Sequence, residues 1–113
     1  MNYEILLKKI EKLEYHQSLL LKMVTDNQHD FFKLVIKYSL DQKDVESFHK
    51  LCEHMSTELE KQKAEGFVYF HPLYEEFRRN LHPNVPVEEV IFACLNQRLF
   101  EPLMVEFKKY LSY

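Results

Sequence analysis

The side chains most able to bind a metal ion lie in the middle of the chain. Glu46 and His49 are three residues apart and Glu53 follows four residues later, so one face of a helix would carry all three. Helical bundles that hold two metal ions use two Glu-x-x-His pairs and further carboxylates, whereas this chain has one such pair. Cys52 would add one ligand, which still falls short of a four-ligand site. We therefore predict no metal and no cofactor, and keep Glu46, His49 and Glu53 as weak metal candidates.

The other groups able to do chemistry do not form a catalytic pattern. Cys52 and Cys94 both lie among apolar residues, as buried free thiols do, and they form no Cys-x-x-Cys pair. One glycine cannot build a phosphate-binding loop or a dinucleotide fingerprint. The remaining histidines are scattered over predicted loops, caps and polar faces: His16, His29, His54, His71 and His82. We predict that the protein is not an enzyme.

The length, composition and charge of the chain indicate what kind of fold holds these residues. The chain has 113 residues, 46% of them apolar, which suits one globular domain. A single glycine is too few for the turns of a sandwich or barrel, and so indicates helices. The net charge of −3 and the pI near 6.1 give nucleic acid and anionic membranes no general attraction. Charges near the start and the lack of a long apolar run predict a cytoplasmic protein without a membrane span.

The first 24 residues carry the clearest pattern. Apolar residues follow one another at spacings of three and four for three heptads, with Leu6, Leu13 and Leu20 at position d. A β-branched residue at position a, here Ile10, favours a coiled coil of two parallel helices. Gln17 is the one polar residue at position a, and a polar residue there commonly fixes the register of the helices. We predict that this heptad helix serves oligomerisation. The expected interface, called the seam below, consists of Leu6, Ile10, Leu13, Gln17, Leu20 and Val24.

A competing interpretation is that the seam packs on later helices of the same chain. Leu7, Leu19, Leu21 and Met23 widen the apolar face beyond a two-stranded contact. We favour self-association into a homodimer or a higher homo-oligomer, and leave open a further, unidentified protein partner.

Residues 27–113 are predicted to form the helical bundle that completes a single domain, residues 1–113. Phe31, Leu34 and Tyr38 mark a short helix with one buried face. A second long helix begins after a cap at Asp41 and ends at Gly66, where a left-handed residue is needed. We predict that residues 67–70 form a buried, extended connector. Three shorter helices follow Pro72, Pro86 and Pro102, which gives an all-α, compact bundle of about six helices.

Three segments together are similar to the YhaI-like family of small uncharacterised proteins from Gram-positive bacteria. They are the heptad helix with IEKLEY (residues 10–15), the helix end EKQKAEGFV (residues 60–68), and VEEVIFA (residues 87–93) with Leu99 and Leu103-Met104 behind it. The resemblance covers nearly the whole chain, and its most specific piece is QKAEGF (residues 62–67). It implies an all-helical, oligomeric cytosolic protein, and it supplies no catalytic residues. Pro86 departs from the capping residue of the Asp type that the resemblance leads us to expect.

The sequence thus predicts a self-associating cytosolic protein that acts as a protein–protein interaction or accessory module. One alternative is a dimeric DNA-binding regulator, although the candidate recognition helices begin with apolar or acidic residues and we predict no nucleic-acid partner. The other alternative is a metal-binding helical bundle protein centred on Glu46, His49 and Glu53.

Overall fold

The regular elements of the structure are all helices, as predicted. The computed structural model describes residues 2–24 and 27–111. Its six α-helices and one short 3-10 helix are α1 (Tyr3–Met23), η1 (Asn27–His29), α2 (Asp30–Lys37), α3 (Gln42–Ala64), α4 (His71–Arg79), α5 (Val87–Gln97) and α6 (Glu101–Lys108). No helix within the described ranges is both long enough and apolar enough to cross a membrane.

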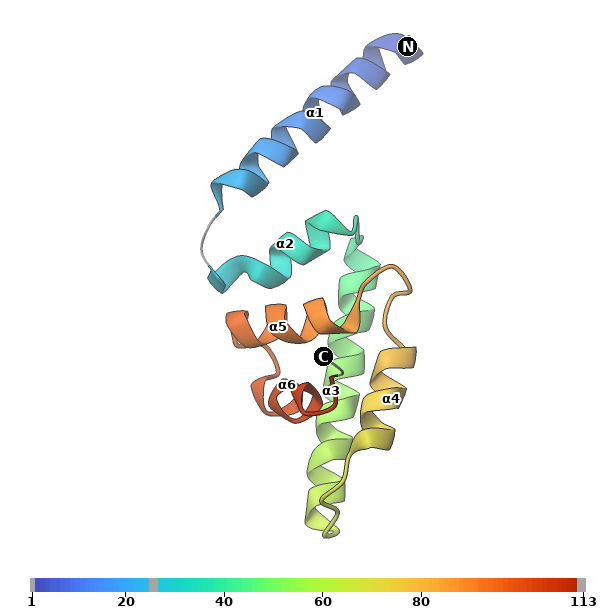
Figure 1. The fold of residues 1–113 in the computed structure, drawn as a ribbon. Helices are drawn as coiled ribbons and strands as arrows, with labels where there is room; N and C mark the ends of the chain where they lie inside the picture. Colours follow the sequence, from blue (N-terminus) through green and yellow to red (C-terminus); the bar gives the residue numbers. More distant parts are fainter. Residues whose placement is uncertain (1, 25–26, 112–113) are drawn as a thin grey trace.

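Helix α1 projects from the rest of the molecule (Figure 1). It begins at Asn2, whose side chain accepts a hydrogen bond from the backbone N–H of Glu4 at 2.9 Å. Its 21 residues extend for about 32 Å, and none of them is buried. The radius of gyration is 17.4 Å, whereas a compact chain of this length would have one of about 13 Å. The difference reflects the projecting helix.

The bundle is built around α5. Helix α5 packs against α2 and η1 on one side and α6 on the other, while α3 contacts both α4 and α6 (Figure 1). Each of the helices α2 to α6 contributes an apolar face to one continuous core. The largest side chains with almost no solvent exposure are Met55, Leu59, Phe77, Ile91, Leu103, Met104 and Phe107.

Both ends of α3 follow from local sequence. At its start, the side chain of Asp41 accepts from the N–H of Asp44 at 2.8 Å, and the side chain of Asp44 accepts from the N–H of Asp41 at 3.0 Å. At its end, Gly66 has a φ of +93°, which glycine adopts with little steric cost. The N–H groups of Gly66 and Phe67 then donate to the carbonyls of Lys63 and Gln62, each at 3.0 Å. The predicted boundaries of this helix are confirmed.

The connector between α3 and α4 differs from its prediction. Only Phe70 is buried, whereas Phe67, Val68 and Tyr69 are exposed, Val68 by 90%. The reason is the length of α3, which carries this turn beyond the end of α4 and away from α5 and α6 (Figure 1). Most of this β-prone apolar run therefore stays in contact with solvent, and only its last two residues reach another part of the chain, where the ring of Tyr69 lies 6.0 Å from that of Tyr110 and Phe70 enters the core.

Candidate functional site

The seam lies on the surface of α1. Leu6, Ile10, Leu13 and Leu20 are exposed by 41%, 43%, 67% and 60%. Helix α1 has no buried residue, so the later helices of the same chain do not cover the seam. Soluble proteins rarely leave a contiguous apolar stripe of this length in water. The seam is therefore a candidate interaction surface.

The helix arranges the seam almost as the heptad pattern requires. Leu6, Ile10, Leu13, Gln17 and Leu20 all lie within one continuous helix. Val24 differs, because it is the C-cap of α1 and has extended backbone angles (φ −86°, ψ 108°). The helix thus ends at Met23, and Leu20 is the last seam residue within it.

Helix α2 extends the apolar surface in a way that the sequence analysis missed. A hollow of about 330 Å³ is lined by Gln17, Leu20 and Val24 of the seam together with Phe32 and Ile36 of α2. Phe32 and Ile36 are 54% and 38% exposed, because the opposite face of α2 supplies Phe31 and Leu34 to the core. The available signal was the four-residue spacing of Phe32 and Ile36 on the outer face of a short amphipathic helix.

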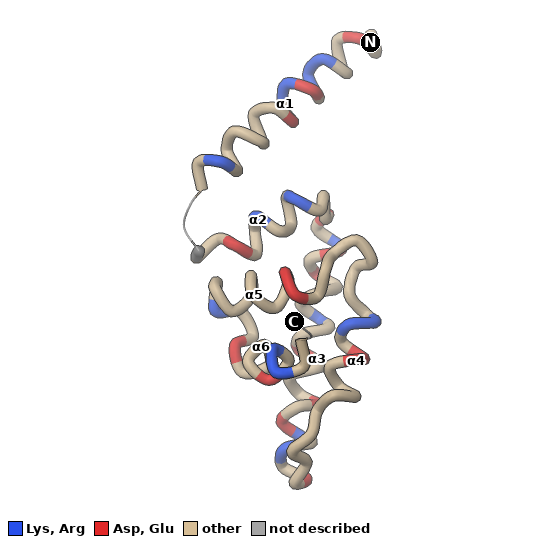
Figure 2. Tube along the Cα trace, viewed as in Figure 1, with Lys and Arg blue, Asp and Glu red and all other residues tan. Residues whose placement is uncertain are grey.

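Residues of both charge signs lie along α1 (Figure 2). In the heptad numbering with Ile10 at position a, Lys9 occupies position g and Glu14 occupies position e. Both residues are exposed. Positions e and g border the core of a coiled coil, so these charges can act on the choice and the direction of a partner helix.

The weak metal candidates are not brought together into a site. The ring of His49 lies half-buried between aromatic rings, with centroids 6.2 Å from Phe31 and 5.7 Å from Phe100. Glu46 accepts a hydrogen bond from the side chain of Gln42 at 3.4 Å, and both Glu46 and Glu53 are exposed. Within residues 2–24 and 27–111, no group of three or more His, Cys, Asp or Glu side chains is placed to hold a metal ion.

The two cysteines are free thiols in the core. Cys52 and Cys94 each have a solvent exposure of 0%. Burial raises the pKa of the Cys94 thiol to about 12, and burial together with the nearby Cys94 raises the pKa of Cys52 as well. Because the thiolate is the nucleophilic form, neither sulfur is activated for catalysis at neutral pH.

The helix starts considered for DNA contact are also part of the core. Leu103 and Met104 in the first turn of α6 are 1% and 0% exposed, and Val87 at the start of α5 is 8% exposed. Arg78 of α4 pairs with Glu75 at 2.6 Å. Charges of both signs are interspersed over α3 to α6 (Figure 2), an arrangement unlike the basic stripe of a DNA-binding face.

These observations define a class of protein: a small helical bundle with a long N-terminal helix whose apolar face is uncovered. The chain belongs to the DUF1878 family, described as a protein of unknown function, whose model matches residues 2–112. The match therefore covers both the projecting helix and the bundle. The resemblance to the YhaI-like family is a separate matter and stays a prediction.

Proposed function

We propose that the protein is a self-associating interaction or accessory module and that α1 is its assembly element. The observation that carries this proposal is that α1 combines a heptad pattern with the absence of any buried residue. A water-exposed stripe of leucines gains about 25 cal/mol for each Å² that a partner covers. A second copy of the same chain supplies a matching stripe, and pairing of identical surfaces closes a two-fold dimer.

The polar residue in the seam favours parallel helices in register. In a parallel dimer, position a packs against position a, so Gln17 meets Gln17 of the partner subunit and the two amides can bond to each other. In an antiparallel dimer, position a packs against position d. Gln17 would then face a leucine, and an amide buried without a hydrogen-bond partner is costly.

The flanking charges favour the same arrangement. In a parallel pair of helices, position g of one helix lies beside the following position e of the other. Lys9 therefore approaches Glu14 of the partner subunit, and the two-fold axis generates this opposite-charge pair twice. Exposed pairs of this kind contribute at most about 1 kcal/mol each. They therefore influence the relative direction of the two helices more than the strength of the dimer.

Solution mass tests the proposal. Light scattering over a hundredfold dilution is expected to give twice the chain mass of 13.8 kDa, or a larger multiple. Leu13→Glu is expected to yield the monomer, because the new carboxylate would be buried without a partner in the interface. Tyr15→Glu on the outer face of α1 adds the same charge and serves as the matched control. A wild-type monomer at every concentration, or an unchanged mass for Leu13→Glu, would contradict the proposal.

Disulfide trapping tests the direction of the helices. In a parallel dimer, Leu6→Cys places two new thiols opposite each other, and mild oxidation is expected to link the chains. Leu6 is at position d and Gln17 is at position a, so in an antiparallel register these two positions face each other, and a mixed disulfide between Leu6→Cys and Gln17→Cys would indicate antiparallel helices instead. The native thiols do not interfere, because Cys52 and Cys94 are buried.

We also propose that the protein is cytoplasmic. Its two cysteines are free and buried rather than joined in a disulfide, which suits a reducing compartment. An assembly built on α1 would leave the surface of the bundle available for other contacts.

A further inference from the structure

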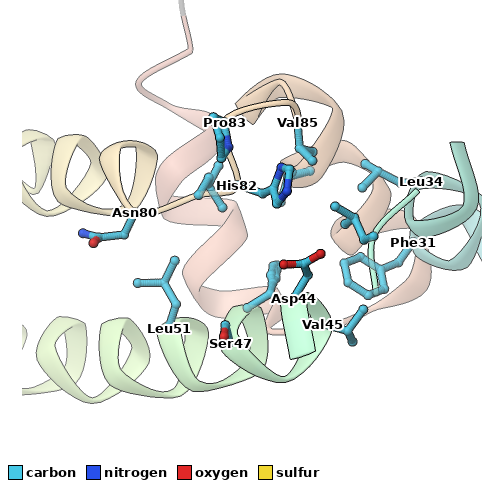
Figure 3. Close-up of a pocket in the computed structure, with 14 residues that line it drawn as sticks. Phe31, Leu34, Asp44, Val45, Ser47, Leu51, Asn80, His82, Pro83 and Val85 are labelled. Atoms are coloured by element: carbon cyan, nitrogen blue, oxygen red, sulfur yellow. The ribbon is translucent and has the colours of Figure 1, made fainter. Parts of the chain in front are cut away.

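A second feature, separate from α1, is a cavity of about 280 Å³ in the bundle. It lies between α2, the first half of α3 and the loop from Asn80 to Val85 that joins α4 to α5 (Figure 3). Its apolar lining includes Phe31, Leu34 and Val85, which are all buried. Ser47 and Pro83 at its edge are exposed, so the cavity opens to solvent.

Two polar side chains from distant parts of the chain point into this cavity, His82 from the loop and Asp44 from the start of α3 (Figure 3). The Nδ1 atom of His82 accepts a hydrogen bond from the N–H of Asn84 at 3.2 Å. The neutral ring therefore carries its proton on Nε2 and can donate it to a ligand. The carboxylate of Asp44 accepts from the N–H of Asp41 at 3.0 Å and has further acceptor capacity.

The volume sets the size of a suitable ligand. An apolar cavity of about 150 Å³ in a protein can stay dry and bind benzene. A cavity of about 280 Å³ would hold nearly twice as much, which corresponds to two fused rings or a chain of about ten carbon atoms.

A larger hollow beside α4 is less suited to such a ligand. Its volume is about 630 Å³, and its walls include Glu75, Arg78, Arg79 and Glu88. Glu75 and Arg78 are paired at 2.6 Å, so an apolar molecule there would lie against charged side chains.

We propose that the cavity between α2, α3 and the α4–α5 loop binds a small, uncharged, mainly apolar alcohol. The apolar part packs against Phe31, Leu34 and Val85. The hydroxyl group lies between the two polar side chains, where it donates to Asp44 and accepts from Nε2 of His82. A hydroxyl satisfies both groups at once, whereas a carboxylate would be repelled by Asp44. Deep apolar pockets with a few convergent polar groups are the usual form of small-molecule sites.

Binding of three naphthalene probes to the full chain tests the proposal. Titrations followed by NMR of the backbone and methyl groups would use 2-naphthol, naphthalene and 2-naphthoate. Saturable binding of 2-naphthol is expected, with shifts at Leu34, Leu51 and Val85 and none along α1. Naphthalene is expected to bind about five- to tenfold more weakly, because it lacks the hydrogen-bonding group. The proposal fails if 2-naphthol does not saturate, if its shifts lie elsewhere, or if 2-naphthoate binds as tightly.

Two variants separate a specific site from general adsorption. Ser47→Phe places a ring at the mouth of the cavity from an exposed position on α3, so the core is left unchanged. It is expected to weaken 2-naphthol binding at least tenfold. His82→Leu removes the donor and is expected to reduce the affinity for 2-naphthol to that for naphthalene. Thermal unfolding of both variants checks the fold, and a folded Ser47→Phe that binds undiminished would overturn the proposal.

Discussion

The hydroxyl group of Tyr110 accepts a hydrogen bond of 2.8 Å from the backbone N–H of Phe70. Phe70 is the N-cap of α4 and is 3% exposed, while Tyr110 follows α6 near the end of the chain. This contact joins two segments that lie 40 residues apart and supplies a partner for a donor that the interior would otherwise leave unpaired.

Removing that hydroxyl should destabilise the bundle. Tyr110→Phe leaves the N–H of Phe70 without its partner, and we expect the free energy of unfolding to fall by about 1 to 2 kcal/mol. Tyr15→Phe removes the same group from an exposed position on α1 and should change it by less than about 0.5 kcal/mol. Urea denaturation monitored by circular dichroism measures both. Equal stabilities for the two variants would show that the contact contributes nothing.

Acid should weaken the contact between α2 and α5. The Tyr38 hydroxyl donates to Glu89, and Lys37 lies 3.2 Å from the same carboxylate. The Tyr38 hydrogen bond and then Lys37 hold the pKa of Glu89 below its ordinary value of 4.5. Because the folded pKa is the lower one, this contribution to stability is present above about pH 4.5 and is lost as the pH falls through the folded value.

The measurement for this cluster is thermal unfolding as a function of pH. Glu89→Gln should melt at a lower temperature than the wild type near neutral pH, and the difference should shrink in acid. Glu88→Gln, at the next position on α5, is the matched control and should show a smaller difference at neutral pH. If the melting temperatures of wild type and Glu89→Gln differ equally at both pH values, the carboxylate is not the source of the effect.

The two buried thiols should react slowly in the native protein, and they should lower its stability at alkaline pH. Burial raises the pKa of both Cys52 and Cys94 above the ordinary value of 9.0. Folding thus favours the protonated thiols. Their contribution to the stability of the folded state is fully present below about pH 9, and it is lost as the pH rises toward the pKa values of the folded state. Between the pKa of a thiol in the unfolded state and its pKa in the folded state, each further pH unit would lower the free energy of unfolding by about 1.4 kcal/mol per thiol.

Two measurements check the thiols. A thiol-reactive dye should label the native protein far more slowly than the urea-unfolded protein near neutral pH. Urea denaturation under reducing conditions should show a steeper loss of stability from about pH 9 upward than in a Cys52→Ala/Cys94→Ala double variant. Rapid native labelling would mean that the core opens around these residues.

Removal of α1 should leave the bundle folded. Because α1 has no buried residue, a chain that begins at residue 27 keeps the whole core. We expect the melting temperature at high dilution to stay within a few degrees of that of the full chain, since surface changes shift stability little. The full chain should gain stability with concentration and the shortened chain should not, because assembly through α1 favours the folded state by mass action. An unfolded shortened chain would show that α1 supports the core.

Local features of the sequence determined the helices and their ends. The heptad spacing predicts α1, the Asp41–Asp44 pair predicts the start of α3, and Gly66 predicts its end, because periodicity, capping and positive φ depend on neighbours within a few residues. The buried faces of the shorter helices follow from the same periodicity. The prediction of an all-helical chain is confirmed for this reason.

Only the tertiary structure decided which apolar surfaces meet. It leaves Leu13 in water, exposes Val68 where a buried connector was predicted, and places His49 among aromatic rings instead of metal ligands. It also brings Asp44 and His82 to one cavity, although they are far apart in the sequence. Burial and proximity depend on the directions in which whole helices pack, and those directions arise from the sum of many weak contacts across the core rather than from any one segment.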